Sequence, residues 1–245
     1  MCSSDLGERL SLFEPEAPGL YIDNADRVGM GESSLYSLTF GVAFLDADRD
    51  GWRDAFIANG HIDDYIERFD SNVTYAERPL FYRNLHGTRF AEVGLQAGPA
   101  LARKRVARGC AVADYDQDGS PDLVVTENNR PAHLFRNDTR TANRYLRVVL
   151  QGQRPNRDAI GARVTVTAGG IRQMQWVRAG GHFYSQSEFP LTFGIGSAAT
   201  ADVTVTWPLG GTTEQKGLGT NRTVTVSEGN LPQAPGTGPG KTRKG

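Results

Sequence analysis

Short apolar segments alternate with polar turns along the first half of the chain. Residues 41–45 and 55–58 are apolar runs bounded by turn-forming residues, and both are too short for buried helices. Residues 109–113 and 123–125 repeat the arrangement. The pattern predicts buried strands that are joined by tight loops.

From residue 143 the pattern changes to an alternation of apolar and polar positions, which is typical of half-buried antiparallel strands. Glycine pairs at 169–170 and 210–211 mark turns between such stretches. The expected strands are residues 145–150, 162–167, 173–177, 203–207 and 223–226. Together they predict a small antiparallel β-sandwich, and the fold class of the whole chain is all-β.

The loop between the first two apolar runs is densely acidic. Four aspartates lie within nine residues, and carboxylates about 5 Å apart repel by about 3 kcal/mol per pair at an effective dielectric of about 20. Ca²⁺ relieves this repulsion well, because it accepts about six to eight oxygen ligands in irregular geometry. The predicted ligands are the side chains of Asp46, Asp48, Asp50 and Asp54 and the carbonyl oxygen of Trp52. Gly51 provides the sharp bend that closes the loop.

The acidic unit recurs 68 residues later, with seven of nineteen positions identical between residues 41–59 and 109–127. The ligands predicted for the second loop are Asp114, Asp116, Asp118, Ser120 and Asp122. Neither loop is an EF-hand, because Ile57 and Val125 stand where an EF-hand has a bidentate glutamate. Repetition at this distance indicates a solenoid or a propeller.

These two Gly-x-Ala-x-x-Asp-x-Asp-x-Asp-Gly-x-x-Asp units resemble the FG-GAP or VCBS-type repeats of integrin-like β-propellers. The resemblance implies that each loop holds a calcium ion. A second resemblance lies further on, where residues 156–164, 180–186, 193–196 and 207–210 are similar, in order, to the ASPIC/UnbV domain. That domain follows FG-GAP repeats in the cartilage acidic protein-like family.

The resemblances imply four segments. We expect a loose lead-in at 1–19, a partial propeller of about two blades at 20–139, the ASPIC/UnbV sandwich at 140–229 and a disordered tail at 230–245. Propellers close with about four to eight blades. We therefore expect a C-terminal fragment of a longer propeller protein, whose first blade leaves an open sheet edge.

Charge and hydropathy narrow the functional classes. The formal charge is −1 with a pI near 6.4, so no overall basic field favours nucleic acid. No apolar run approaches 18 residues, so no membrane insertion is predicted. No secretory signal is visible at the start of the chain.

The leading hypothesis is a non-catalytic, calcium-binding interaction protein with structural calcium. As the resemblance implies, it would be extracellular, periplasmic or at the cell surface, with a protein or glycan partner. The alternative, implied by the likeness to UnbV, is an accessory protein or enzyme of a bacterial biosynthetic pathway. Convergent polar groups around His182 and Asp158 would favour that alternative.

Several smaller features have an unremarkable interpretation that we prefer. His182 lies near Ser185, Ser187 and Glu188 in sequence, but proximity in sequence does not define a catalytic site. The basic run 101–108 is expected to be a solvated edge.

The polar insertion at 60–78 carries His61, Asp63, Asp64 and Asp70, which either form another metal site or belong to a solvated loop; the second is preferred. Cys110 is predicted to be a small core residue. A disulfide between Cys2 and Cys110 is the less favoured alternative.

Overall fold

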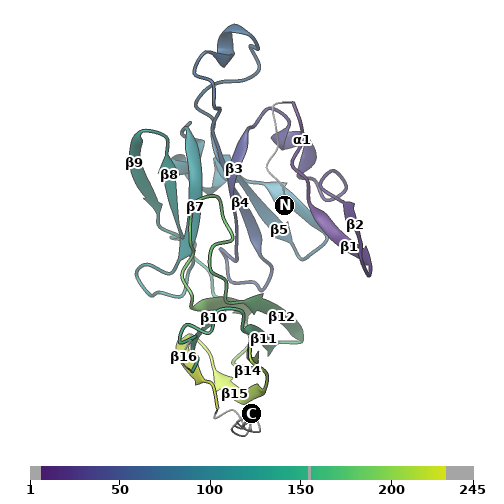
Figure 1. The fold of residues 1–245 in the computed structure, drawn as a ribbon, viewed down its shortest axis with the longest axis vertical. Helices are drawn as coiled ribbons and strands as arrows, with labels where there is room; N and C mark the ends of the chain where they lie inside the picture. Colours follow the sequence, from purple (N-terminus) through teal and green to yellow (C-terminus); the bar gives the residue numbers. More distant parts are fainter. Residues whose placement is uncertain (1–6, 154–155, 230–245) are drawn as a thin grey trace, which may run out of the picture.

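A computed structural model describes residues 7–153 and 156–229. As predicted, the chain is all-β, and the strands of the described residues form five sheets. Two of the larger sheets lie in the upper part of the molecule and two form a sandwich beneath them (Figure 1). The predicted tail at 230–245 lies outside the described residues.

The first large sheet is a meander in which each strand pairs antiparallel with the next. Its strands are β3 (Thr39–Leu45), β4 (Asp54–Asn59), β5 (Leu80–Leu85) and β6 (Arg89–Glu92). All six residues of β4 are buried. Because both faces of β4 are buried, the sequence shows a continuous apolar run there and not an alternation of apolar and polar residues.

The second large sheet lies beside the first, and its strands are β7 (Ala107–Ala113), β8 (Asp122–Glu127) and β9 (Arg130–Phe135). Strand β3 approaches β7 so closely that a Cβ at Gly41 would lie 2.7 Å from the Arg108 carbonyl oxygen. A shared apolar layer fills the space between the sheets, with Phe56 and Ala43 on one side and Cys110 and Val125 on the other. Within the described residues the two sheets do not close into a ring or barrel, which is consistent with a partial propeller.

The lead-in differs from the loose segment that we expected. From residue 7 onward it is described, and β1 (Phe13–Ala17) and β2 (Leu20–Asp23) form a hairpin. Leu10 is only 1% exposed and packs with Met30 and Tyr82 against the first large sheet. The lead-in is ordered because that sheet face would otherwise leave apolar surface in water.

The sandwich is built from a three-stranded sheet and a four-stranded sheet. Its strands are β10 (Arg144–Gln151), β11 (Arg163–Ala168), β12 (Ile171–Trp176), β13 (Leu191–Gly196), β14 (Thr200–Thr206), β15 (Thr212–Gly219) and β16 (Arg222–Ser227). Leu146, Phe193, Val164 and Trp207 belong to one apolar core between the two sheets. All strand pairs of the sandwich are antiparallel except β10 and β16, which run parallel.

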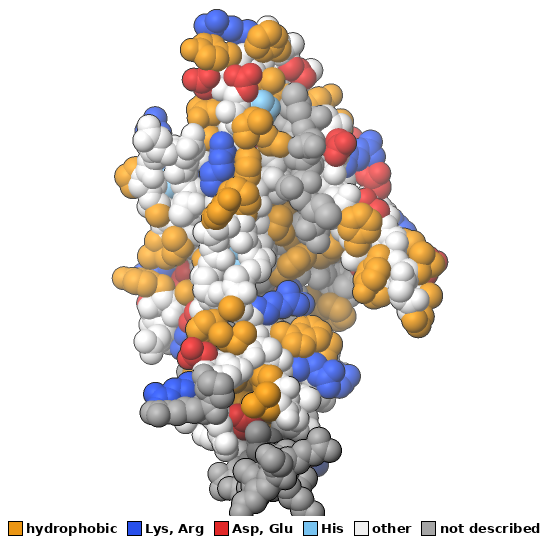
Figure 2. Space-filling model, viewed as in Figure 1, with side chains coloured by type: hydrophobic (Ala, Val, Ile, Leu, Met, Phe, Trp, Pro, Cys, Tyr) orange, Lys and Arg blue, Asp and Glu red, His pale blue; other side chains and the backbone are white. Residues whose placement is uncertain are grey.

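Within residues 7–153 and 156–229 the helices are single turns: α1 (Gly31–Ser34), α2 (Gly94–Ala97), α3 (Pro99–Ala102) and the 3₁₀ turn η1 (Ile66–Arg68). In the described part of the chain no helix has the length and hydropathy to cross a membrane. The insertion between β4 and β5 carries η1 and projects from the top of the molecule (Figure 1). Hydrophobic, basic and acidic side chains lie together at its tip in Figure 2, and Phe69 of the insertion is 80% exposed.

The basic run is not the solvated edge that we expected. Arg105 is buried, donates to the Ala100 carbonyl at 2.8 Å and forms an ion pair with Glu127 at 3.2 Å. Arg108 donates to the carbonyl oxygens of Gly60 and His61 at 2.8 and 2.9 Å. The guanidinium groups are recruited because irregular backbone near the insertion leaves carbonyl groups that need donors.

Cys110 is a buried, free thiol in the layer between the two large sheets, as a core residue should be. Burial raises the pKa of this thiol to about 12. Its proposed partner, Cys2, lies outside the described residues.

Candidate metal centres

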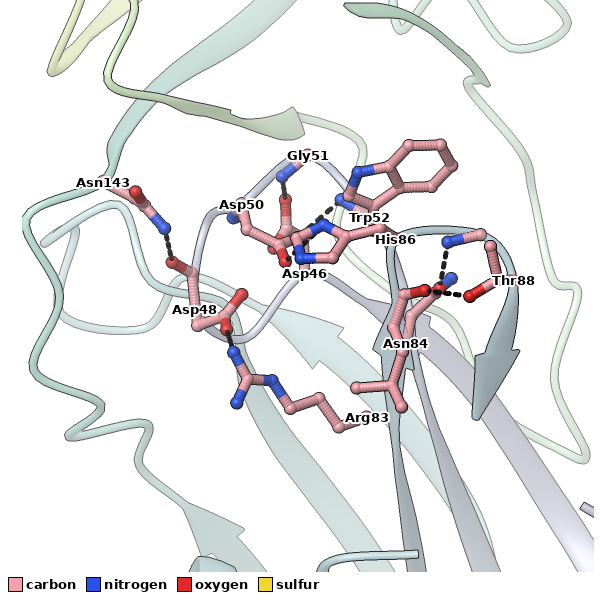
Figure 3. A network of polar contacts seen from close by, with 12 residues as sticks. Asp46, Asp48, Asp50, Gly51, Trp52, Arg83, Asn84, His86, Thr88 and Asn143 are labelled. Carbon is pink, nitrogen blue, oxygen red and sulfur yellow. Dashed lines mark hydrogen bonds and ion pairs between the residues drawn. The ribbon is translucent and has the colours of Figure 1, made fainter. Parts of the chain in front are cut away.

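The first acidic loop joins β3 to β4 and is held by its own backbone. Asp46 accepts hydrogen bonds from the amides of Asp50 and Gly51 at 3.0 and 2.8 Å. The Trp52 amide donates to Asp50 at 2.8 Å. Gly51 has φ +96°, a conformation that glycine adopts without strain. The loop therefore wraps around the Asp46 carboxylate, which Figure 3 places beneath the Gly51 amide.

One carboxylate oxygen from each of Asp46, Asp48 and Asp50 lies within 4.8 Å of the others. Ca²⁺ binds oxygens at about 2.3–2.6 Å, so ligands on opposite sides of the ion stand about 5 Å apart. This spacing fits a single calcium ion. Asp54 is not in this group, and its two oxygens accept the amides of Ala47 at 3.0 Å and Asn84 at 2.8 Å.

The second loop, between β7 and β8, repeats these contacts. Gly119 donates to Asp114 at 3.1 Å, and Ser120 donates to Asp118 at 2.7 Å. Asp122 accepts the amides of Tyr115 at 2.9 Å and Asn137 at 2.7 Å. The two loops that repeat in sequence therefore also share the same pattern of backbone hydrogen bonds to aspartate side chains.

The group of carboxylate oxygens that could hold an ion in the second loop comes from Asp114, Asp116 and Asp122. The Oδ1 atom of Asp114 is buried without a hydrogen-bond partner. A buried carboxylate oxygen without a partner is costly. A cation in the loop would satisfy this atom, so the donor set fits calcium here as well.

Burial makes the ionised form of these aspartates unfavourable. It raises the pKa of Asp46 to about 7, with neighbouring carboxylates adding to the effect and the Gly51 amide opposing it. Burial likewise raises the pKa of Asp54 to about 7. The pKa values of Asp114 and Asp122 are also raised by burial. Each loop therefore concentrates negative charge that only a nearby cation or a proton can offset.

The sandwich contacts both acidic loops. Asn143 donates to the Asp48 carbonyl at 2.9 Å (Figure 3), and the Gly196 amide donates to the Arg49 carbonyl at 3.0 Å. A Cβ at Gly194 would lie 2.0 Å from Asp46 Oδ2. The pattern of apolar positions gave no sign of these contacts, since they depend on how two separate sheets pack.

A segment of the sandwich also covers the free edge of β7. The Val112 amide donates to Ser187 at 2.9 Å, and the Glu188 amide donates back to the Val112 carbonyl at 3.0 Å. A Cβ at Gly109 would lie 2.9 Å from the Phe183 carbonyl oxygen. Gly109 thus faces this segment in the same way that Gly41 faces β7.

His182 and Ser187 come together, while Asp158 lies elsewhere. His182 Nδ1 is 2.7 Å from the Val42 carbonyl oxygen, which can only accept, so Nδ1 carries the proton. Nε2 is 2.9 Å from the Ser187 hydroxyl. Because Ser187 also accepts the Val112 amide, the pair ties the segment to both large sheets. Among the described residues the insertion at 60–78 contributes no comparable group of metal-ligating side chains.

The fold and these loops define an all-β protein with two repeated aspartate loops seated on a β-sandwich. Comparison with known proteins adds to this description. Residues 152–233 match the family described as ASPIC and UnbV.

Curated relatives include cartilage acidic protein 1 from three species. The mouse protein (Mus musculus) is 26% identical over 258 residues, which cover 85% of this chain and 39% of the relative. The human protein (Homo sapiens) is 31% identical over 157 residues, which cover 60% of this chain and 23% of the relative. The frog protein (Xenopus tropicalis) is 24% identical, over 85% of this chain and 39% of the relative. The chain thus contains a region that matches the ASPIC and UnbV family model, is distantly similar to cartilage acidic protein 1, and spans less than half the length of these relatives.

Proposed function

We propose that this chain is a calcium-stabilised, non-catalytic interaction module in which FG-GAP/VCBS-type propeller repeats precede the ASPIC/UnbV domain. Each aspartate loop holds one calcium ion that pins the turn between two strands. The observation that carries the proposal is the duplicated loop, in which three carboxylates, at least one of them buried, converge to within 4.8 Å of one another. The unpartnered oxygen of Asp114 supports it independently.

The ion would be structural. In the first loop Asp46 and Asp48, with Asp50, are the residues that would hold it, and in the second Asp114 and Asp116, with Asp122. Bound calcium supplies positive charge that stabilises the ionised carboxylates, and it raises the stability of the folded state by mass action. Because both loops contact the sandwich, calcium would also fix the two parts of the molecule relative to each other.

Placement outside the cell, at its surface or in the periplasm suits such loops, because weak calcium sites need the higher calcium concentrations found there. The name of the relatives, which refers to cartilage, supports this placement. A protein or a glycan is the partner that we propose for the module.

The alternative is an accessory protein or enzyme of a bacterial biosynthetic pathway. One observation favours it, because His182 and Ser187 line a cavity. The cavity does not include Asp158, and the group facing His182 Nδ1 is a backbone carbonyl where catalytic triads have a carboxylate. We therefore keep the non-catalytic interpretation.

Thermal unfolding in excess calcium and in chelator tests the proposal. The wild type should melt higher with calcium, and Asp46→Ala and Asp114→Ala should each lose part of that rise. Asp158→Ala is the matched control, since it removes an exposed carboxylate outside both loops. A folded wild type with the same melting temperature in both conditions would contradict structural calcium.

A further inference from the structure

A cavity of about 340 Å³ opens where the first large sheet meets the sandwich. Its walls come from β3 and the loop after it, from the end of β12 and from the segment that covers β7. Figure 2 shows basic and hydrophobic side chains side by side in the zone where the upper sheets meet the sandwich. The volume is near the lower end of the range for small-molecule sites, about 300–1,000 Å³.

Two arginines line this cavity, one from each part of the molecule. Arg53 is the last residue of the first acidic loop, directly before β4, and Arg178 lies two residues after β12. Their guanidinium carbons lie 5.8 Å from the Phe44 ring centroid and 5.6 Å from the Trp176 ring centroid. Neither guanidinium has a hydrogen-bond or ion-pair partner among residues 7–153 and 156–229, although Arg178 repels Arg53 and the charge of Asp46 attracts it. Their donors remain available for a ligand.

The carboxylates that line the same cavity are already engaged. Asp46 accepts two backbone amides of its own loop. Glu188 pairs with Arg147 and accepts the Asp114 amide at 2.9 Å. The charge that the cavity can offer to a ligand is therefore positive, and two guanidinium groups match carboxylate or sulfate oxygens in geometry.

The two aromatic rings set the shape of the ligand. Trp176 is 40% exposed and Phe44 is 37% exposed, and each ring carries an arginine at its face. An exposed indole offers a flat apolar surface for a ring to stack on. The cavity holds about one such ring.

We propose that this cavity binds an acidic sugar residue, a pyranose that bears a carboxylate or a sulfate. Arg53 and Arg178 hold the anionic group, and the ring of the sugar lies against Trp176. This site goes beyond the calcium sites, because its ligand contacts come from Arg53, Arg178 and Trp176 and not from the carboxylates that would hold calcium. It gives the module a glycan-facing surface at the junction of its two parts.

The site can be tested by NMR on the full chain in calcium, because its three tryptophans give three indole N–H signals. Trp176→Phe assigns the signal of interest. Titration with glucuronate or with glucose 6-sulfate should shift the Trp176 signal, while glucose, which lacks the charge, should not. Arg53→Gln and Arg178→Gln should each weaken binding about tenfold or more, the size expected for hydrogen bonds to a charged group.

The control is Arg222→Gln, since Arg222 is exposed on β16 and does not line the cavity. The affinity of Arg222→Gln for glucuronate and for glucose 6-sulfate should equal that of the wild type. A disaccharide with glucuronate at its non-reducing end distinguishes two ligands. If the site recognises the end of a glycan, the disaccharide should bind more tightly than free glucuronate; if it recognises a free sugar acid, it should not. The inference is overturned if neither anion shifts the Trp176 signal, if glucose binds equally well, or if Arg222→Gln matches the cavity variants. These outcomes are independent of the calcium melts that test the proposed function.

Discussion

The two aspartate loops share their hydrogen bonds but differ in how their charge is balanced. In the second loop the Arg147 Nε atom lies 3.7 Å from Asp114 Oδ2, so a cation of the protein already faces the buried carboxylate. In the first loop no described basic side chain lies within ion-pair distance of Asp46. Arg83 there pairs at 2.6 Å with Asp48, and its side chain is about half exposed.

This difference suggests that one repeat has partly replaced an ion with an arginine. Under the proposed function the first loop needs calcium more, because Asp46 has no ion-pair partner among the described residues, although the charge of Arg53 attracts it. The second loop has a partial substitute that also ties it to the sandwich through Glu188. We therefore predict a tight first site and a weaker second site.

The largest expected effect is that calcium removes a pH dependence of stability. The pKa values of Asp46 and Asp54 are raised to about 7 in the folded chain, above the ordinary value of 3.8. Between these values the folded state holds protons that the unfolded state has lost, so without calcium the free energy of unfolding should fall as pH rises from about 4 to about 7. Calcium should remove this fall, since it stabilises the ionised carboxylates.

Melting temperatures from pH 5 to pH 8, in chelator and in calcium, check this prediction. Glu77 provides the control, because burial raises its pKa to about 7 as well, and it lies outside both loops. The contribution of Glu77 to the pH dependence of stability should persist in calcium and disappear in the Glu77→Gln variant. Equal pH slopes with and without calcium would show that the loops do not hold the ion.

The next effect in size separates the two loops directly. Asp46→Asn should weaken calcium binding at its site about a hundredfold, which corresponds to about 2.7 kcal/mol. Asp114→Asn should cost about tenfold at the second site, because Arg147 already offsets part of that charge. Calorimetric titration of each variant with calcium measures the affinity of the altered site and of the site that is left intact. Losses of equal size would remove the proposed difference between the loops.

The sequence predicts the aspartate loops well because each is a local structure. Glycine and aspartate at fixed spacing determine the turn. Asn84 in β5 and Asn137, two residues after β9, each supply an amide to the last aspartate of a loop. The apolar runs locate β3, β4, β7 and β8 for the same reason. Whether the loops bind calcium stays a prediction.

The sequence does not reveal what depends on packing between distant segments. Strands β13 and β15 were not expected, since glycines interrupt the alternation in both. The parallel pairing of β10 with β16 leaves no local signal. The ordered lead-in was missed because its prolines and acidic residues suggest a loop, while Leu10 alone indicates burial. Arg53 and Arg178 are far apart in sequence, and the cavity that they share appears only in three dimensions.

A smaller effect tests the contact between the first loop and the sandwich. Gly194→Ala would place a methyl group 2.0 Å from Asp46 Oδ2 and 2.5 Å from the Arg49 Cα atom. The backbone cannot easily yield, so we expect a loss of about 2 kcal/mol, typical of overpacking, and weaker calcium binding at the first site alone. Gly219→Ala is the control, because nothing lies within 4 Å of its Cβ position. Chemical denaturation and calcium titration measure the two effects, and a Gly194→Ala protein that matches the control in both would contradict this contact.

The smallest effect concerns the arginine that distinguishes the loops. Arg147→Met keeps the unbranched apolar stem of the side chain but removes the charge beside Asp114, so calcium should bind the second site about fivefold more tightly, worth about 1 kcal/mol. Arg83→Met is the matched change at the first loop. It should alter calcium affinity less, since Arg83 is about half exposed and solvent screens its charge. If Arg147→Met weakens calcium binding, the arginine helps to form the site and does not substitute for the ion.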